Sequence, residues 1–162
     1  MLSDALRAPA GSVAERLAAR GETVAVAESS AGGLVSAALL SVPGASAYFR
    51  GGVVVYTLAG AKAVLRDAAG LDPGERGATE RFARYLAASA AALHGADWGV
   101  GETGAAGPSG NRYGDPAGHA WVAVAAPGGG VSAEHVLTGE GDRVANMHAF
   151  AERALRALDA AL

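Results

Sequence analysis

The chain has 162 residues, with 13 Lys and Arg against 16 Asp and Glu, a net charge of -3 and no cysteine. This length predicts a single domain over residues 1–162 with a sizeable core. The charge balance argues against a nucleic-acid-binding protein, because neutralising phosphates needs a basic surface. The lack of cysteine excludes disulfides, thiolate nucleophiles and cysteine-ligated zinc.

Helical and strand periodicities alternate along the first half of the chain. The patterns predict a helix over 2–20 divided near Pro9 and Gly11, a strand over 23–27, a helix over 33–41, a strand over 47–57 with a kink or bulge at Gly51-Gly52, and a short helix over 61–68.

The second half opens with the longest predicted helix, which runs from residue 79 to about residue 94 and ends at Gly95. The patterns then predict a strand over 98–103, a hairpin of strands over 119–126 and 131–137, and a closing helix over 142–162. Strands alternating with helices are typical of an α/β fold, and the hairpin makes the sheet mixed. We therefore expect a three-layer α/β/α architecture with a mixed, mostly parallel sheet.

The sequence contains no pattern of a targeting or membrane segment. The first twenty residues carry Asp4, Arg7, Glu15 and Arg16 and lack the apolar run of a signal peptide. No stretch approaches the roughly 18 apolar residues of a membrane span. We therefore expect a cytoplasmic protein without a membrane partner.

Lys62 is the single lysine, since the other twelve basic residues are arginines. This ratio indicates a composition bias that replaces lysine by arginine. Lys62 is then either a chance survivor of that bias or a position that requires an amine. Lysine can be neutralised by burial, whereas arginine stays charged.

Reactive groups in such sheets lie beyond the carboxyl ends of the strands, which here means segments 28–33, 56–62 and 104–110. In the first, Ser29 and Ser30 precede the pair Gly32-Gly33. These serines are either helix caps or part of a site whose free amides hold an anion or oxyanion.

If the strand before Lys62 lies beside the strand before Ser29, the two side chains can approach. A desolvated lysine can deprotonate a serine hydroxyl, as in Ser-Lys hydrolases, although surface exposure is the usual fate of lysines. Tyr56 either hydrogen-bonds into this site or packs.

Other chemistries find less support in the sequence. Segment 104–110 is glycine-rich but lacks the Gly-Lys-Ser/Thr ending of a nucleoside triphosphatase, so it is a phosphate loop or an ordinary loop. Arg143 either clamps an anion or forms a surface salt bridge. The four histidines, at 94, 119, 135 and 148, have no triad or metal-ligand spacing, and Gly-x-Ser-x-Gly is absent.

Five motifs occur in a familiar order: AESSAGG at 27–33, GGVVVYT followed by a lysine, GAAGP at 104–108, Pro116-x-Gly118, and GDR at 141–143. The set resembles the C-terminal domain of the CinA (competence/damage-inducible) family, also known as nicotinamide-nucleotide amidases. The resemblance covers nearly the whole chain and has no counterpart of the family's usual N-terminal molybdopterin-binding-like domain, so we expect the stand-alone form.

The resemblance implies hydrolysis of nicotinamide mononucleotide to nicotinic acid mononucleotide and ammonia, with no metal or cofactor and with a mononucleotide as the small-molecule partner. It implies Ser29 as nucleophile, Lys62 as its base and Tyr56 as a third catalytic residue. The implied substrate-binding residues are Ser30, Gly32, Gly33, Gly104, Ala106, Gly107, Pro108 and Arg143. Small α/β enzymes of this kind often pair, so we expect a homo-oligomer.

The sequence departs from the family pattern near these residues. Ser30 stands where the family usually has Cys, Ala31 where it has Thr, and Met147 where it often carries a second Arg. Lys62 follows Tyr56 by six residues rather than five. The alternative is therefore a catalytically silent member that binds a nucleotide or a protein partner in the same cleft.

Overall fold

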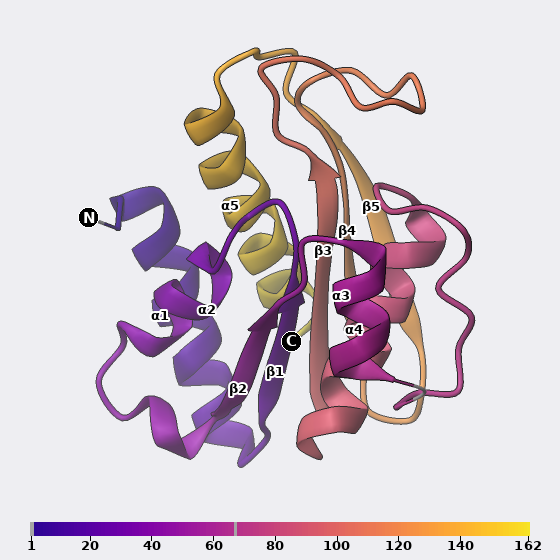
Figure 1. Ribbon diagram of the computed structural model, residues 1–162. Coiled ribbons are helices and arrows are strands. Elements are labelled where there is room, and N and C mark those ends of the chain that lie inside the picture. Colours follow the sequence, from indigo (N-terminus) through magenta and orange to yellow (C-terminus); the bar gives the residue numbers. More distant parts are fainter. Residues whose placement is uncertain (1, 67) are drawn as a thin grey trace.

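A computed structural model describes residues 2–66 and 68–162 and contains one five-stranded sheet with helices on both faces (Figure 1). The strands are β1 (Val24–Glu28), β2 (Phe49–Val54), β3 (Trp98–Ala105), β4 (His119–Ala125) and β5 (Val131–Leu137). The helices are α1 (Asp4–Arg20), α2 (Leu34–Leu40), α3 (Leu58–Leu65), α4 (Glu80–His94) and α5 (Arg143–Ala161), with a 3-10 turn, η1, at Ala45–Ala47.

The sheet has the order β2-β1-β3-β4-β5. β1 pairs in parallel with both β2 and β3, whereas β4 is antiparallel to β3 and to β5, so four of the five strands share one direction. Helices α1, α2 and α5 cover one face and α3 and α4 the other (Figure 1). The expected three-layer architecture with a mixed sheet is confirmed.

This strand order places the site. Because β1, β2 and β3 are parallel neighbours, their carboxyl ends lie at the same edge of the sheet. The three segments singled out in the sequence follow these ends.

An extra residue interrupts the pairing of β1 with β2. Val24 pairs with Phe49 but Ala25 pairs with Gly51, which leaves Arg50 without a partner in the register. The bulge expected at Gly51-Gly52 therefore lies one residue earlier, and β2 is shorter than the predicted strand.

Helix α4 packs directly on the backbone of β3. A Cβ added at Gly101 would lie 2.2 Å from the carbonyl oxygen of Ala83, and one at Gly99 would lie 1.9 Å from that of Ala87. Only glycine permits this approach, so the contact fixes the position of β3 against the helix.

Two helices, α1 and α3, differ from the sequence-based expectation. α1 runs unbroken through Pro9 and Gly11, because the residues buried along one of its faces, such as Leu6 and Val13, belong to the main core and their packing outweighs the local cost of proline. α3 begins at Leu58 rather than residue 61, because the Thr57 hydroxyl caps it by accepting the Gly60 amide at 3.0 Å.

The larger core cluster lies between the sheet and the layer of α1, α2 and α5, and a smaller one lies beneath α3 and α4. In the described part of the chain, no helix is both long and apolar enough to cross a membrane.

Candidate active site

Ser29 follows β1 and lines a pocket of about 310 Å³ at the carboxyl edge of the parallel strands. The pocket is also lined by Tyr56, which follows β2, and by Thr103 and Gly104 of β3. The remaining lining residues are Thr57, Leu58, Glu75, Arg76, Gly77, Ala78, Phe82, Asn111, Arg112 and Tyr113. The parallel order therefore brings together residues from all three segments that the sequence indicated.

The turn after β1 requires glycine. Gly32 and Gly33 have φ values of 67° and 100°, in the left-handed region. A Cβ at Gly32 would lie 2.8 Å from Cε of Met147, and the Gly32 amide donates to the Ser29 carbonyl at 3.2 Å. Met147 thus packs against the turn that carries Ser29.

Glu28 occupies the first amides of α2. Its carboxylate accepts the amides of Val35 and Ser36 at 3.1 and 3.0 Å and the Ser36 hydroxyl at 2.7 Å. These two amides, which the sequence offered as anion donors, are therefore already engaged within the protein.

Glu102, in the middle of buried β3, was missed by the sequence reasoning. Its carboxylate accepts the amides of Ser29 and Ala31 at 3.0 and 2.8 Å and a short hydrogen bond from the Ser30 hydroxyl. Burial raises the pKa of Glu102 to about 7. A charged residue inside a strand with the buried pattern Gly-Val-Gly was the feature that could have revealed it.

Arg143 joins two of the segments at the mouth of the site. It donates from Nη2 to the Tyr56 hydroxyl at 3.0 Å and from Nη1 to the Gly107 carbonyl at 2.7 Å. Its guanidinium lies 5.9 Å from the centre of the Tyr56 ring. The structure thus brings Arg143, Tyr56 and Gly107 together beside the Ser29 pocket.

Ala106 and Pro108, which flank Gly107, do not line the Ser29 pocket. Ala106 is buried in the main core, and its carbonyl accepts Nδ2 of Asn146 at 2.8 Å. Pro108 follows a cis peptide bond and is exposed.

Lys62 is an exposed residue of α3. It lines a hollow of about 580 Å³ with Asp72, Glu75 and Arg76, and the last two also line the Ser29 pocket. Within residues 2–66 and 68–162, no hydrogen bond or ion pair joins Lys62 to Ser29. The amine is therefore next to the site, without the burial that the sequence argument invoked.

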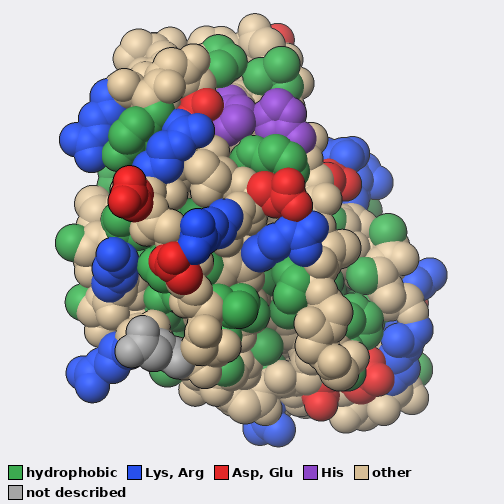
Figure 2. Space-filling view, turned by 90° about the vertical axis from the view of Figure 1, so that its right-hand side faces the viewer, with side chains coloured by type: hydrophobic (Ala, Val, Ile, Leu, Met, Phe, Trp, Pro, Cys, Tyr) green, Lys and Arg blue, Asp and Glu red, His purple; other side chains and the backbone are tan. Residues whose placement is uncertain are grey.

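Two further arginines form the outer rim of the pocket. The guanidinium groups of Arg76 and Arg112 each lie 5.0 Å from the centre of the Tyr113 ring. Arg76 also pairs with Asp115 at 2.8 Å. Figure 2, which faces the right-hand side of Figure 1, shows side chains of both charges distributed over that surface.

Ala78, at the floor of the pocket, has a φ of 55°. Its amide donates to Oγ1 of Thr103 at 3.0 Å, and its carbonyl lies 2.9 Å from Nε2 of His119. Nδ1 of His119 is in turn 2.8 Å from Nε2 of His135. The histidine pair thus has a structural contact, which holds an uncommon backbone conformation.

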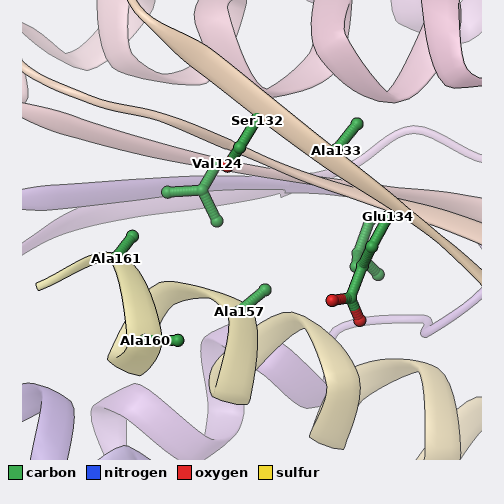
Figure 3. Close-up of a pocket in the computed structure, with 8 residues that line it drawn as sticks. Val124, Ser132, Ala133, Glu134, Ala157, Ala160 and Ala161 are labelled. Carbon is green, nitrogen blue, oxygen red and sulfur yellow. The ribbon is translucent and has the colours of Figure 1, made fainter.

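A separate hollow of about 270 Å³ lies between the sheet and the end of α5 (Figure 3). Small side chains such as Ala133, Ala157 and Ala161 line most of it. Its carboxylate, Glu134, is paired with Arg153 at 2.7 Å. This hollow holds none of the residues that the motifs indicated. Across the residues described here, no cluster of three or more His, Cys, Asp or Glu side chains is arranged to hold a metal ion.

Residues 7–162 match the family model "CinA C-terminal domain". The chain is 45% identical over 138 residues to a CinA-like protein of Anaeromyxobacter sp. (strain K), covering 85% of this chain and 34% of that protein. It is 37% identical over 163 residues to a CinA-like protein of Acidobacterium capsulatum, covering 95% of this chain and 38% of that one. The chain thus spans about a third of the length of these relatives.

Solved structures share the fold. The competence/damage-inducible protein CihA of Agrobacterium tumefaciens superposes with a TM-score of 0.87 at 26% identity, covering 99% of this chain and 97% of that one. The competence damage-inducible protein A of Klebsiella pneumoniae superposes with a TM-score of 0.85 at 28% identity, covering 96% and 95%.

Proposed function

This chain belongs to the CinA C-terminal domain family, and on that premise we propose that it hydrolyses nicotinamide mononucleotide to nicotinic acid mononucleotide and ammonia. The observation that carries the proposal is the position of Ser29. It lines a pocket with Tyr56 and Gly104 and lies next to the Arg143 contacts. A serine presented to such a pocket from the end of a parallel strand can act as a nucleophile.

The charge of the rim fits a phosphate-bearing substrate. Arg76 and Arg112 line the pocket, and Arg143 adjoins it through Tyr56. Guanidinium groups bind phosphate in a bidentate manner. We assign the phosphate of the mononucleotide to this rim and its carboxamide to the inner end, where Ser29 lies.

The reaction proceeds through an acyl-enzyme. Lys62 takes the proton of the Ser29 hydroxyl, and the oxygen attacks the carboxamide carbon. Because the amides of Ser29, Ala31 and Gly32 are engaged within the protein, we assign the oxyanion to the Gly33 amide at the end of this turn. The carbon–nitrogen bond then breaks, the nitrogen takes a proton and leaves as ammonia, and water cleaves the ester to give the carboxylate and free Ser29.

The role of Lys62 requires a movement. Its side chain lines the neighbouring hollow, which shares Glu75 and Arg76 with the Ser29 pocket. A movement of the Lys62 side chain past these two residues on substrate binding would bring its amine to the Ser29 hydroxyl. Such rearrangements of loops on ligand binding are common in enzymes.

The same position of Lys62 favours the second candidate, a silent member of the family. In that case the pocket binds a nucleotide and Ser29 remains unmodified. Binding of nicotinamide mononucleotide without ammonia release would support this candidate.

The deciding experiment measures ammonia release and, by calorimetry, binding of nicotinamide mononucleotide. The variants are Ser29→Ala and Lys62→Arg, with Arg156→Lys on the far end of α5 as a matched control. We expect both site variants to bind the substrate and to lose at least about 100-fold in kcat, because Ser29→Ala removes the attacking oxygen and Lys62→Arg removes the group assigned to take its proton. Undiminished release by Ser29→Ala would refute the nucleophile, and undiminished release by Lys62→Arg would refute the base.

A further inference from the structure

Two glutamates lie side by side in the sheet behind Ser29. Glu28 ends β1, Glu102 is its register partner on β3, and both are fully buried. Among the described residues, neither forms an ion pair. Buried carboxylates without a cation are stabilised only through their hydrogen bonds.

The two carboxylates hold different segments. Glu28 accepts its hydrogen bonds from Val35 and Ser36 of α2. Glu102 accepts its three from the consecutive residues Ser29, Ser30 and Ala31. Glu102 therefore holds the turn that carries the serine, whereas Glu28 holds the helix that follows.

Burial raises the pKa of Glu102 to about 7, and the negative charge of Glu28 acts in the same direction. The hydrogen bonds from Ser30, Ala31 and Ser29 oppose this rise. The carboxyl group therefore changes its charge near neutral pH.

In the part of the chain that the structure describes, the ionisable neighbour of Glu102 is a second glutamate. β1 contributes Glu28, and β4 places the apolar Val122 opposite Glu102 in the register. Of α5, the buried residues are uncharged and include Asn146 and Phe150. Helix α4 lies on the opposite face, against Gly101, and α2 has no ionisable residue.

We propose that Glu102 is a positioning residue: as a carboxylate it clamps residues 29–31 so that Ser29 faces the pocket, and on protonation it releases that clamp. The effect on catalysis rests on the proposed amidase function; the change in the turn does not. A proton taken from solvent on Oε1 would be donated to Oγ of Ser30, whose own hydroxyl proton is then free for another acceptor. Hydrogen bonds to a charged group are about twice as strong as those to a neutral one, so the amides of Ser29 and Ala31 are held less tightly.

The first test follows the backbone amides of Ser29 and Ala31 by NMR between about pH 5.5 and 8.5, without substrate. We expect both amide shifts to titrate with one midpoint near pH 7 in the wild type and to stay constant in Glu102→Gln. Glu134→Gln, which removes a carboxylate from the hollow beside α5, should leave the midpoint unchanged. Flat amide shifts in the wild type, or a midpoint that survives in Glu102→Gln, would overturn the proposal.

Ser30→Ala supplies a second variant that does not depend on the fate of Glu102→Gln. The Ser30 hydrogen bond lowers the pKa of Glu102. Its removal should move the midpoint to higher pH, by about 1 to 2 units for a hydrogen bond to a charged group. An unmoved midpoint would show that the titrating group is not Glu102.

The second test measures kcat for ammonia release over the same pH range. We expect the wild type to lose about tenfold below the midpoint, as for the loss of one charge-assisted hydrogen bond. Glu102→Gln should stay at the low value throughout. If the amide shifts of Ser29 and Ala31 titrate but the protein releases no ammonia, the amidase proposal is refuted and the proposal for Glu102 is supported. Ammonia release without this pH limb refutes the clamp and leaves the amidase standing.

Discussion

Replacing Glu102 by Gln should make the protein more stable at neutral pH, in a manner that depends on pH. The side chain has no cation partner and is fully buried. An amide of the same shape keeps an oxygen for the two turn amides and presents its NH₂ group to the Ser30 hydroxyl. The charge is lost while the packing is retained.

The magnitude follows from the raised pKa of Glu102, about 7 in the folded protein against 4.5 for an ordinary glutamate. The folded state of the wild type binds the Glu102 proton more tightly than the unfolded state does. Proton binding therefore stabilises the folded wild type fully below pH 4.5, and this contribution is lost as pH rises through 7. This difference in pKa corresponds to about 3 kcal/mol in total, most of which falls between about pH 5 and 8. Glu102→Gln lacks this loss.

The assay is urea unfolding followed by circular dichroism at about pH 5, 6, 7 and 8 and constant ionic strength. The free energy of unfolding of Glu102→Gln minus that of the wild type should rise by about 2 to 3 kcal/mol across this range. Glu134→Gln, an ion-paired carboxylate on β5, should show no such slope. A difference that stays constant with pH would refute the burial argument.

Three further results are expected. Gly101→Ala should lower the free energy of unfolding by about 3 kcal/mol, because its Cβ would meet the α4 backbone. Gly11→Ala, with open space around it, should raise the free energy of unfolding by about 1 kcal/mol. Equal effects of the two variants in urea unfolding would contradict the close packing of α4 on Gly101. Asp142→Ala should lower the free energy of unfolding by about 1 kcal/mol in the same assay, because the Asp142 carboxylate caps α5 by accepting the Ala145 amide at 2.7 Å. Asp142→Asn should retain most of this stability. Arg143→Lys should raise KM for nicotinamide mononucleotide about tenfold, since an ammonium cannot reproduce both guanidinium contacts; an unchanged KM would remove Arg143 from the substrate site.

The parts of the fold that follow from local patterns were predictable. The β4–β5 hairpin and the end of α4 at Gly95 lie where turn and capping residues place them. The continuity of α1 through Pro9 was not predictable, because it depends on packing against residues distant in the sequence. Local propensity is a weak guide where tertiary contacts oppose it.

The site was predictable to the extent that topology determines it. Ser29 and Tyr56 meet because each follows one of two parallel, adjacent strands. The partnership of Glu102 with Ser30 was not predictable, because it depends on which strand lies beside β1 and on which side of the sheet each side chain projects. Lys62 lines a hollow beside the Ser29 pocket, and the loop residues Glu75 and Arg76 that the two share lie where the sequence offers no periodicity.

Glu75 and Arg76 belong to the linings of two neighbouring hollows, of about 310 and 580 Å³. Because both residues lie in the loop before α4, a change of loop length there would alter the shape of the two hollows without changing the strands of the sheet. A substrate larger than the Ser29 pocket could therefore extend past these two residues into the second hollow.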